Sequence, residues 1–161
     1  MKNKLTPKEI KNLVRLLKKV KLPAPYPVFV ALAKSVPFIA VDIAVMPDKN
    51  HILLTYRKDE FYDGWHIPGS ILRYGELVEN AYKRVMRKEL GMKILKPKFI
   101  NYFDVLFDYH DKGIVLLFAV KLKVKPKIGK YFSLKNLPEN FLKCQRSETR
   151  YLKNSKIDLF K

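Results

Sequence analysis

The residues that could perform chemistry gather in one stretch, from Gly64 to Met92 (GWHIPGSILRYGELVENAYKRVMRKELGM). The stretch turns at Pro68-Gly69 and at Gly75, and it then has the apolar spacing of a helix that a glycine, Gly91, should end. Glu89 continues the apolar stripe of this helix. Burying even a neutral polar group without a partner costs roughly 2–7 kcal/mol, so the Glu89 carboxylate requires a cation or strong donors.

Two kinds of partner would satisfy Glu89, and the turn at Gly69 is the nearest segment that could supply one. The chain has 33 Lys and Arg against 15 Asp and Glu, so periodicity alone favours an ordinary pair with Arg or Lys over a bound metal ion. The helix should pack through its apolar stripe and direct its basic residues elsewhere. The stripe consists of Val78, Tyr82, Val85 and Met86, and the basic residues are Lys83, Arg84, Arg87 and Lys88.

The segment 69–92 resembles a Nudix box, the loop and helix that bind a divalent cation and pyrophosphate in Nudix hydrolases. The family pattern is Gly, five residues, Glu, seven residues, and then Arg-Glu-apolar-x-Glu-Glu-x-Gly-apolar. The positions that fit this pattern are Glu76, Arg84, Met86, Glu89 and Gly91-Met92. Ser70, Val85 and Lys88 stand where the pattern has Gly, Glu and Glu, so two of three acidic metal ligands are missing and the box is degenerate.

This degenerate box is similar to that of one Nudix subfamily, the GDP-mannose mannosyl hydrolases, which also keep only the last Glu and have an apolar residue after the Arg. The resemblance covers residues 35–92. Within it, SVPFIAVDIAV places Asp42 at a substrate-contacting position, although a core polar group bonded to the backbone is the alternative. LLTYR places Arg57 at the position of an arginine that helps the nucleoside diphosphate leave. In WHIPG, Gly69 matches the glycine whose carbonyl binds the metal, and Trp65 becomes a substrate-binding candidate.

The resemblance implies an α/β fold, the Nudix α/β/α sandwich with a mixed β-sheet between helices. It implies one Mg²⁺, with Mn²⁺ as an alternative, held by the Gly69 carbonyl, Glu89 and the diphosphate of a nucleotide sugar or related substrate. Arg84 would add positive charge or, in the interpretation we favour, orient the loop by pairing with Glu76. Mannosyl hydrolases attack the sugar carbon, whereas ordinary Nudix enzymes attack phosphorus, and the sequence leaves both reactions open.

The general base is the part of the resemblance that the chain does not reproduce. The subfamily supplies a Gln ligand and a His base from a loop before the last strand, but the corresponding residues 124–130 (VKPKIGK) contain neither. His110, in an expected hairpin turn, has a suitable intrinsic pKa of about 6.5 and is our candidate catalytic base. Asp104, Asp108 and Asp111 are further candidates that spacing does not distinguish, whereas His51 and His66 are expected to be structural.

A second hypothesis follows from the net charge of +18. A Nudix fold without full catalysis could bind RNA or a nucleotide through its basic surface, because positive charge gives affinity for phosphates without sequence information. The basic residues are spread along the chain, and they do not cluster with aromatic side chains that could stack on bases. We therefore rank this nucleic-acid-binding module below the hydrolase.

The chain as a whole is expected to form a single domain, residues 1–161, long enough to bury a sizeable core. Residues 1–22 should form an amphipathic helix with a capping box at Thr6-Pro7-Lys8-Glu9, and by analogy with the subfamily this helix could serve a homodimer. One cysteine, no signal peptide and no apolar run long enough to span a membrane indicate a cytoplasmic protein. Strands are expected at 38–46, 51–57, 98–109, 114–125 and 131–134, and short helices at 26–34, 136–142 and 147–152.

Overall fold

The computed structural model describes residues 5–21, 24–59, 62–92, 96–106, 112–122 and 127–155. The chain divides into two compact units, Met1–Leu32 and Ala33–Lys161, which are described separately. No helix among the described residues is long and apolar enough to cross a membrane.

The first unit contains helix α1 (Pro7–Leu17) and most of helix α2 (Tyr26–Ala33). The expected capping box is present at the start of α1: the Thr6 hydroxyl accepts from the Glu9 backbone N–H at 3.3 Å, and the Glu9 carboxylate accepts from the Thr6 N–H at 2.7 Å. The box satisfies backbone donors that the first turn leaves without partners. The helix ends at Leu17, five residues earlier than the expected boundary of 22.

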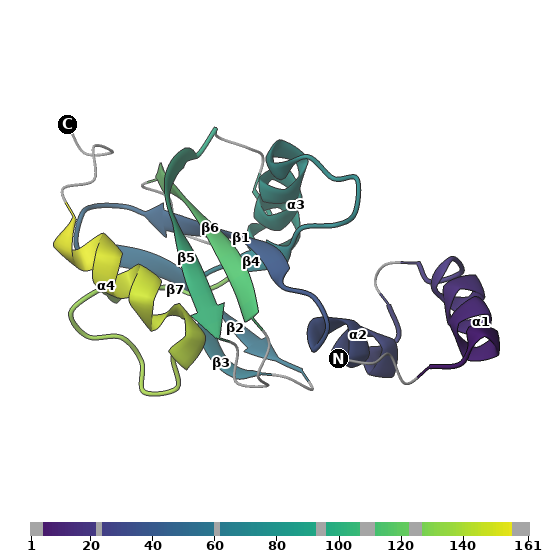
Figure 1. Ribbon diagram of the computed structural model, residues 1–161. Helices are drawn as coiled ribbons and strands as arrows, with labels where there is room; N and C mark the ends of the chain where they lie inside the picture. Colours follow the sequence, from purple (N-terminus) through teal and green to yellow (C-terminus); the bar gives the residue numbers. More distant parts are fainter. Residues whose placement is uncertain are drawn as a thin grey trace. The chain divides into compact units, whose positions relative to one another are not determined.

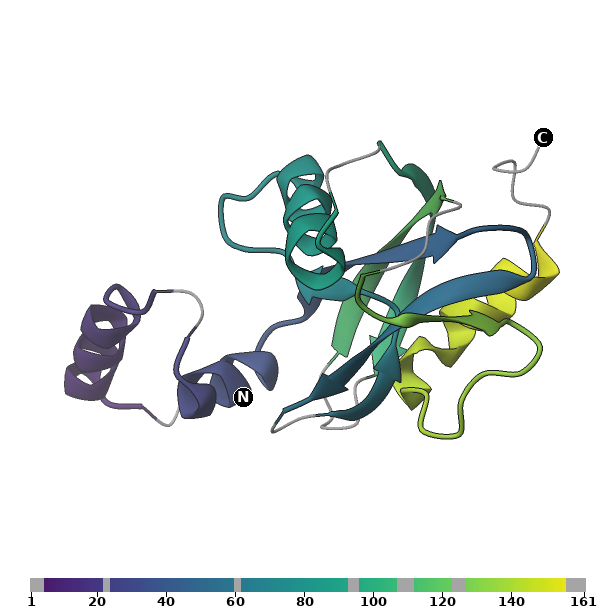
Figure 2. The same ribbon diagram turned by 180° about the vertical axis from the view of Figure 1, so that it is seen from behind.

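The second unit is built on two sheets (Figures 1 and 2). A four-stranded mixed sheet has the order β4-β1-β6-β5, and β1 lies parallel to β6 and antiparallel to β4. A three-stranded antiparallel sheet has the order β3-β2-β7. The strands are β1 (Phe38–Met46), β2 (His51–Lys58), β3 (Asp63–His66), β4 (Gly69–Ile71), β5 (Lys98–Leu106), β6 (Lys112–Lys121) and β7 (Lys130–Ser133).

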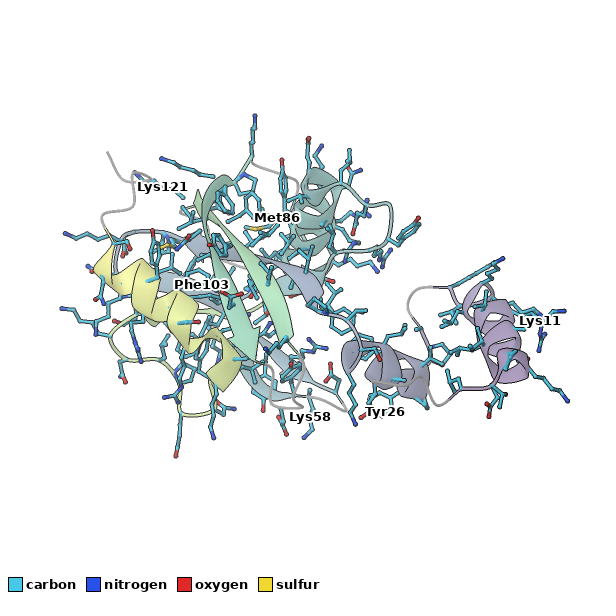
Figure 3. The ribbon with its side chains drawn as sticks, viewed as in Figure 1. Lys11, Tyr26, Lys58, Met86, Phe103 and Lys121 are labelled. Carbon is cyan, nitrogen blue, oxygen red and sulfur yellow. The ribbon has the colours of Figure 1, made fainter. Side chains whose placement is uncertain are left out.

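Two helices, α3 (Val78–Leu90) and α4 (Arg146–Asn154), cover opposite sides of these strands, as the two ribbon views show. A 3₁₀ turn, η1 (Lys143–Gln145), precedes α4. Alternation along β1 sends Val41 and Ile43 into a core beneath α3, while Ala44 packs in a second core with Leu152 of α4. Met86 belongs to the first core, and Phe103 contacts Tyr151 of α4 with ring centroids 5.6 Å apart (Figure 3). The expected α/β/α sandwich is therefore confirmed.

Most of the expected elements are present, and two expectations are wrong. Strands β5 and β6 form the expected antiparallel pair, and α3 ends at Gly91, whose φ of 62° suits glycine. Residues 136–142 form turns and bridges instead of a helix, because Trp65 exchanges backbone hydrogen bonds with Asn140 and Leu142. Arg84 was expected to point away from the core, but its side chain is 10% exposed.

Candidate functional site

The strand register brings Asp42 and Gly69 together at the centre of the site. Asp42 lies on β1 and pairs directly with Gly69, the first residue of β4. A Cβ atom at position 69 would lie 1.8 Å from Asp42 Oδ1, so only glycine allows this close approach. The turn that the family resemblance predicts to bind the metal therefore lies directly against a buried carboxyl group.

Glu89 reaches the same turn from the last part of α3. Its Oε2 accepts a hydrogen bond from the Gly69 N–H at 3.2 Å and lies 3.9 Å from His66 Nε2. Burial raises the pKa of Glu89 to about 7; the Gly69 hydrogen bond and the charges of Arg57 and Arg84 oppose the rise, and the negative charge of Asp42 adds to it. Within the described part of the chain, Glu89 makes no ion pair with Lys or Arg, the partners that periodicity alone favoured.

Arg84 and Glu76 form the pair expected from the sequence, and together they hold the loop that follows the turn. The guanidinium donates to the Glu76 carboxylate at 2.8 and 2.7 Å, to Ser70 Oγ at 2.8 Å and to the Ile71 carbonyl at 3.0 Å. The hydrogen bonds from Arg84 lower the pKa of Glu76 to about 2. The hydrogen bonds of the planar guanidinium explain why Arg84 is buried. Periodicity places Arg84 off the apolar stripe of α3, but the loop folds over its side chain.

Gln145, which the sequence did not mark as a site residue, joins η1 to the turn. Its Oε1 accepts from the Ile67 N–H at 2.7 Å, and its Nε2 donates to the Ile67 carbonyl at 3.1 Å and to Asp42 Oδ2 at 2.5 Å. The Gln145 carboxamide therefore holds both the backbone of Ile67, two residues before Gly69, and the Asp42 carboxyl group that packs against Gly69. No local spacing pattern predicts this contact, because Gln145 and Asp42 are 103 residues apart.

Glu148 is the second residue that the sequence analysis missed. It is fully buried on α4, and neither of its carboxylate oxygens has a donor among the described residues. Burial raises the pKa of both Glu148 and Asp42, and the negative charge of Asp42 raises the pKa of Glu148 further. A proton held between the two carboxyls would satisfy both. The available signal was the spacing of Glu148 and Leu152, which puts a carboxylate on the apolar face of a helix.

Arg57 and Trp65, the other substrate-binding candidates, lie on the neighbouring strands β2 and β3. The Arg57 Nε donates to the Asp59 carboxylate, and its guanidinium lies 4.8 Å from the centre of the Tyr62 ring. Its positive charge still acts on the pKa values of Asp42, His66 and Glu89. Trp65 is partly buried and packs edge-to-face against Tyr56 and Phe132, with ring centroids 5.4 and 4.8 Å away.

The histidines expected to be structural have structural partners. His66 is buried between the Ile67 carbonyl, 2.8 Å from Nδ1, and the Thr55 hydroxyl, 3.1 Å from Nε2. Burial and then the charge of Arg57 lower the pKa of His66 to about 4, so it is neutral at pH 7. His51 pairs with Asp48 at 2.9 Å.

The candidate bases remain predictions. His110 lies outside the described residues, as do Asp108 and Asp111. Asp104 is exposed on β5, where its backbone pairs with Ile114 of β6.

The oxygen atoms at the turn suit a hard divalent cation, and the substrate would complete the coordination of that cation. The described residues hold no cluster of three or more His, Cys, Asp or Glu able to bind a metal by themselves. Mg²⁺ does not need such a cluster, because it is commonly bound through one or two carboxylates, with waters and substrate phosphates as the other ligands. The Glu89 carboxylate, held beside the backbone of Gly69, fits this requirement.

Comparison with known proteins decides the family. A model of the NUDIX domain matches residues 36–147. The chain belongs to the Nudix domain family. Residues 1–35, which include α1, lie outside the matched Nudix region.

Two curated relatives resemble parts of this Nudix chain. The low-salt glycan biosynthesis protein Agl8 of Haloferax volcanii is 29% identical over 82 residues, which are 50% of this chain and 52% of that protein. The 8-oxo-dGTP diphosphatase of Buchnera aphidicola is 34% identical over 61 residues, 38% of this chain and 48% of that protein. The chain thus spans about half the length of each curated relative.

Solved Nudix structures agree with the fold. The MutT NUDIX hydrolase of Burkholderia pseudomallei superposes with a TM-score of 0.62 at 20% identity, covering 71% of this chain and 97% of that one. The bifunctional NMN adenylyltransferase/ADP ribose pyrophosphatase of Francisella tularensis gives a TM-score of 0.56 at 18% identity, covering 80% and 46%. At these identities the likeness concerns the fold alone.

Proposed function

We propose that this Nudix protein is a Mg²⁺-dependent hydrolase of a nucleoside diphosphate derivative, with a nucleotide sugar as its substrate. The observation that carries the proposal is the position of Glu89, which is held by the Gly69 N–H beside the buried carboxyl of Asp42. Glu89 keeps a side-chain exposure of 28%, so the side chain is not sealed from solvent.

The Gly69 carbonyl and Glu89 would hold the Mg²⁺, which Mn²⁺ could replace. Bound to the diphosphate, the cation supplies charge neutralisation and makes the nucleoside diphosphate a better leaving group. The raised pKa of Glu89 fits this role. Burial destabilises the charged form of the carboxylate, so a neighbouring cation stabilises it more than it would stabilise an exposed carboxylate.

The other residues around the turn keep it in shape and supply charge. Arg84 and Glu76 lock the loop that follows Gly69, and Gln145 locks the backbone that precedes it. Arg57 lies close enough to act electrostatically on Glu89 and would help the diphosphate leave. Asp42 is only 4% exposed and is bonded to Gln145, which favours a positioning role over direct contact with the substrate.

The choice of a nucleotide sugar rests on the box itself. Its single remaining acidic ligand, Glu89, and the apolar Val85 after Arg84 match the pattern of the mannosyl hydrolases. One curated relative is named for glycan biosynthesis, which agrees with a sugar-bearing substrate, while another is named as a diphosphatase of 8-oxo-dGTP. Product analysis distinguishes a nucleotide-sugar substrate from a nucleoside triphosphate.

Product analysis tests the proposal. The protein is incubated with Mg²⁺ and GDP-mannose, GDP-glucose, ADP-ribose or nucleoside triphosphates, with Glu89→Gln as the control variant. Free sugar and nucleoside diphosphate, lost in the variant, are the expected result. Nucleoside monophosphate and sugar phosphate would instead show attack on phosphorus. No turnover and no Mg²⁺-dependent nucleotide binding would refute the hydrolase and leave the basic surface as the functional feature.

A further inference from the structure

Helix α4 has two functional faces. At 3.6 residues per turn, Glu148 and Leu152 share the face that is buried against the sheet, and Arg146, Arg150 and Lys153 lie on the other side. This second face forms one wall of a cavity of about 400 Å³, which we call the α4 pocket. The pocket is lined by Leu134, Lys135, Leu137, Pro138, Glu139, Phe141, Arg146, Thr149, Arg150 and Lys153.

The α4 pocket has an excess of positive charge. Four of its lining residues are basic, namely Lys135, Arg146, Arg150 and Lys153, and one, Glu139, is acidic. All five are exposed, and no ion pair within the described ranges involves any of the four cations. Like charges that line one cavity repel each other, and an anion bound among them would relieve that repulsion.

Of the remaining lining residues, Thr149 lies on α4, and the other four are apolar and come from the segment between β7 and η1. Leu134 and Phe141 are buried, while Leu137 and Pro138 are partly exposed. The pocket is open to solvent, and it combines apolar residues with a few convergent charges, as sites for small molecules do. Its lining suits a ligand that has both a phosphate group and an apolar part.

We propose that the α4 pocket is a second ligand site, which binds a small phosphorylated molecule of the nucleotide class. Arg146 and Arg150 are one helical turn apart, so both of their planar guanidinium groups can donate hydrogen bonds to the oxygens of one phosphate group. The apolar wall would contact the base. The site is separate from the metal turn, because Glu148 faces Asp42 from the opposite side of the helix.

Binding of fluorescently labelled GDP to the full chain tests this site, with EDTA present so that the Glu89 turn cannot bind a metal–nucleotide complex. The test variant is Arg146→Glu with Arg150→Glu. The matched control is Lys8→Glu with Lys11→Glu on α1, which changes the net charge equally. We expect 1:1 binding, weakened at least ~10-fold in the test variant and little changed in the control and in Glu89→Gln.

Two results would overturn the proposal: equal weakening in both double variants, which would show only the effect of net charge, or no GDP binding in EDTA. In the second case, binding of oligonucleotides that grows with their length would indicate a nucleic-acid surface instead. Circular dichroism checks that each variant folds. If the glutamate variant does not fold, Arg146→Gln with Arg150→Gln removes the same charges without reversing them. Hydrogen exchange with bound GDP should show protection within residues 143–154 and none at residues 86–90.

Discussion

Replacing Glu76 by Gln should destabilise the protein, because it leaves the Arg84 guanidinium without its counter-charge while the loop still covers it. The two side chains are 13% and 10% exposed and are joined by two hydrogen bonds. The pKa of Glu76 falls from 4.5 to about 2, a difference that corresponds to about 3 kcal/mol. One edge of the carboxylate reaches water, so we expect a loss of about 2 kcal/mol.

A double-mutant cycle measures the pair itself. Arg84→Met also removes the hydrogen bonds to Ser70 and Ile71, and should cost about 3–5 kcal/mol. The combined variant should cost about 2 kcal/mol less than the sum of the single changes. Urea unfolding at pH 7 gives the free energy of unfolding of the wild type, the two single variants and the double variant.

The contribution of Glu76 should depend on pH in one direction. Its folded pKa is depressed, so the stabilisation is complete above the unfolded value of 4.5 and is lost as the pH falls towards about 2. The stability difference between wild type and Glu76→Gln should therefore shrink between pH 5 and pH 2. Glu79→Gln, which breaks only an exposed pair with Lys83, is the control and should change stability far less. The reasoning would be refuted by a coupling energy between Glu76 and Arg84 below about 0.5 kcal/mol, or by a stability difference between wild type and Glu76→Gln that does not vary with pH.

Three further predictions concern the turn. Gly69→Ala should force Asp42 aside and cost about 1–3 kcal/mol in thermal unfolding, and adding Asp42→Gly should recover part of that loss. Gln145→Leu should weaken Mg²⁺ binding in calorimetry, because the Ile67 backbone loses both its hydrogen bonds to Gln145. Lys143→Leu, at an exposed position of the same turn, should leave the affinity unchanged; equal affinities of the two variants would contradict the role of Gln145. Mg²⁺ affinity should rise as the pH passes about 7, because the proton on Glu89 competes with the metal; a flat profile from pH 6 to 8 would argue against Glu89 as a ligand.

The sequence predicts those features of the site that depend on local pattern. The buried strand β1, the glycine that ends α3 and the pair of Glu76 with Arg84 all follow from local pattern or from family resemblance. The contacts of Gln145 and Glu148 do not, because they depend on how α4 packs against β1.

The incorrect expectation of a helix over residues 136–142 has a similar cause. Local composition allows a helix there, but backbone hydrogen bonds to Trp65 of β3 hold the segment in turns and bridges. Tertiary contacts outweigh propensity in a segment this short.

The bond between Gln145 and Asp42 also sets an order of events during synthesis. A ribosome adds about 5–20 residues per second, so Gln145 emerges roughly 5–20 s after Asp42. For about the second half of that interval, once Met92 has emerged, the nascent chain contains the complete box, but the turn at Gly69 has no support from η1. We therefore expect the box of a growing chain to stay inactive until Gln145 has left the exit tunnel, so that translation itself limits when the site matures.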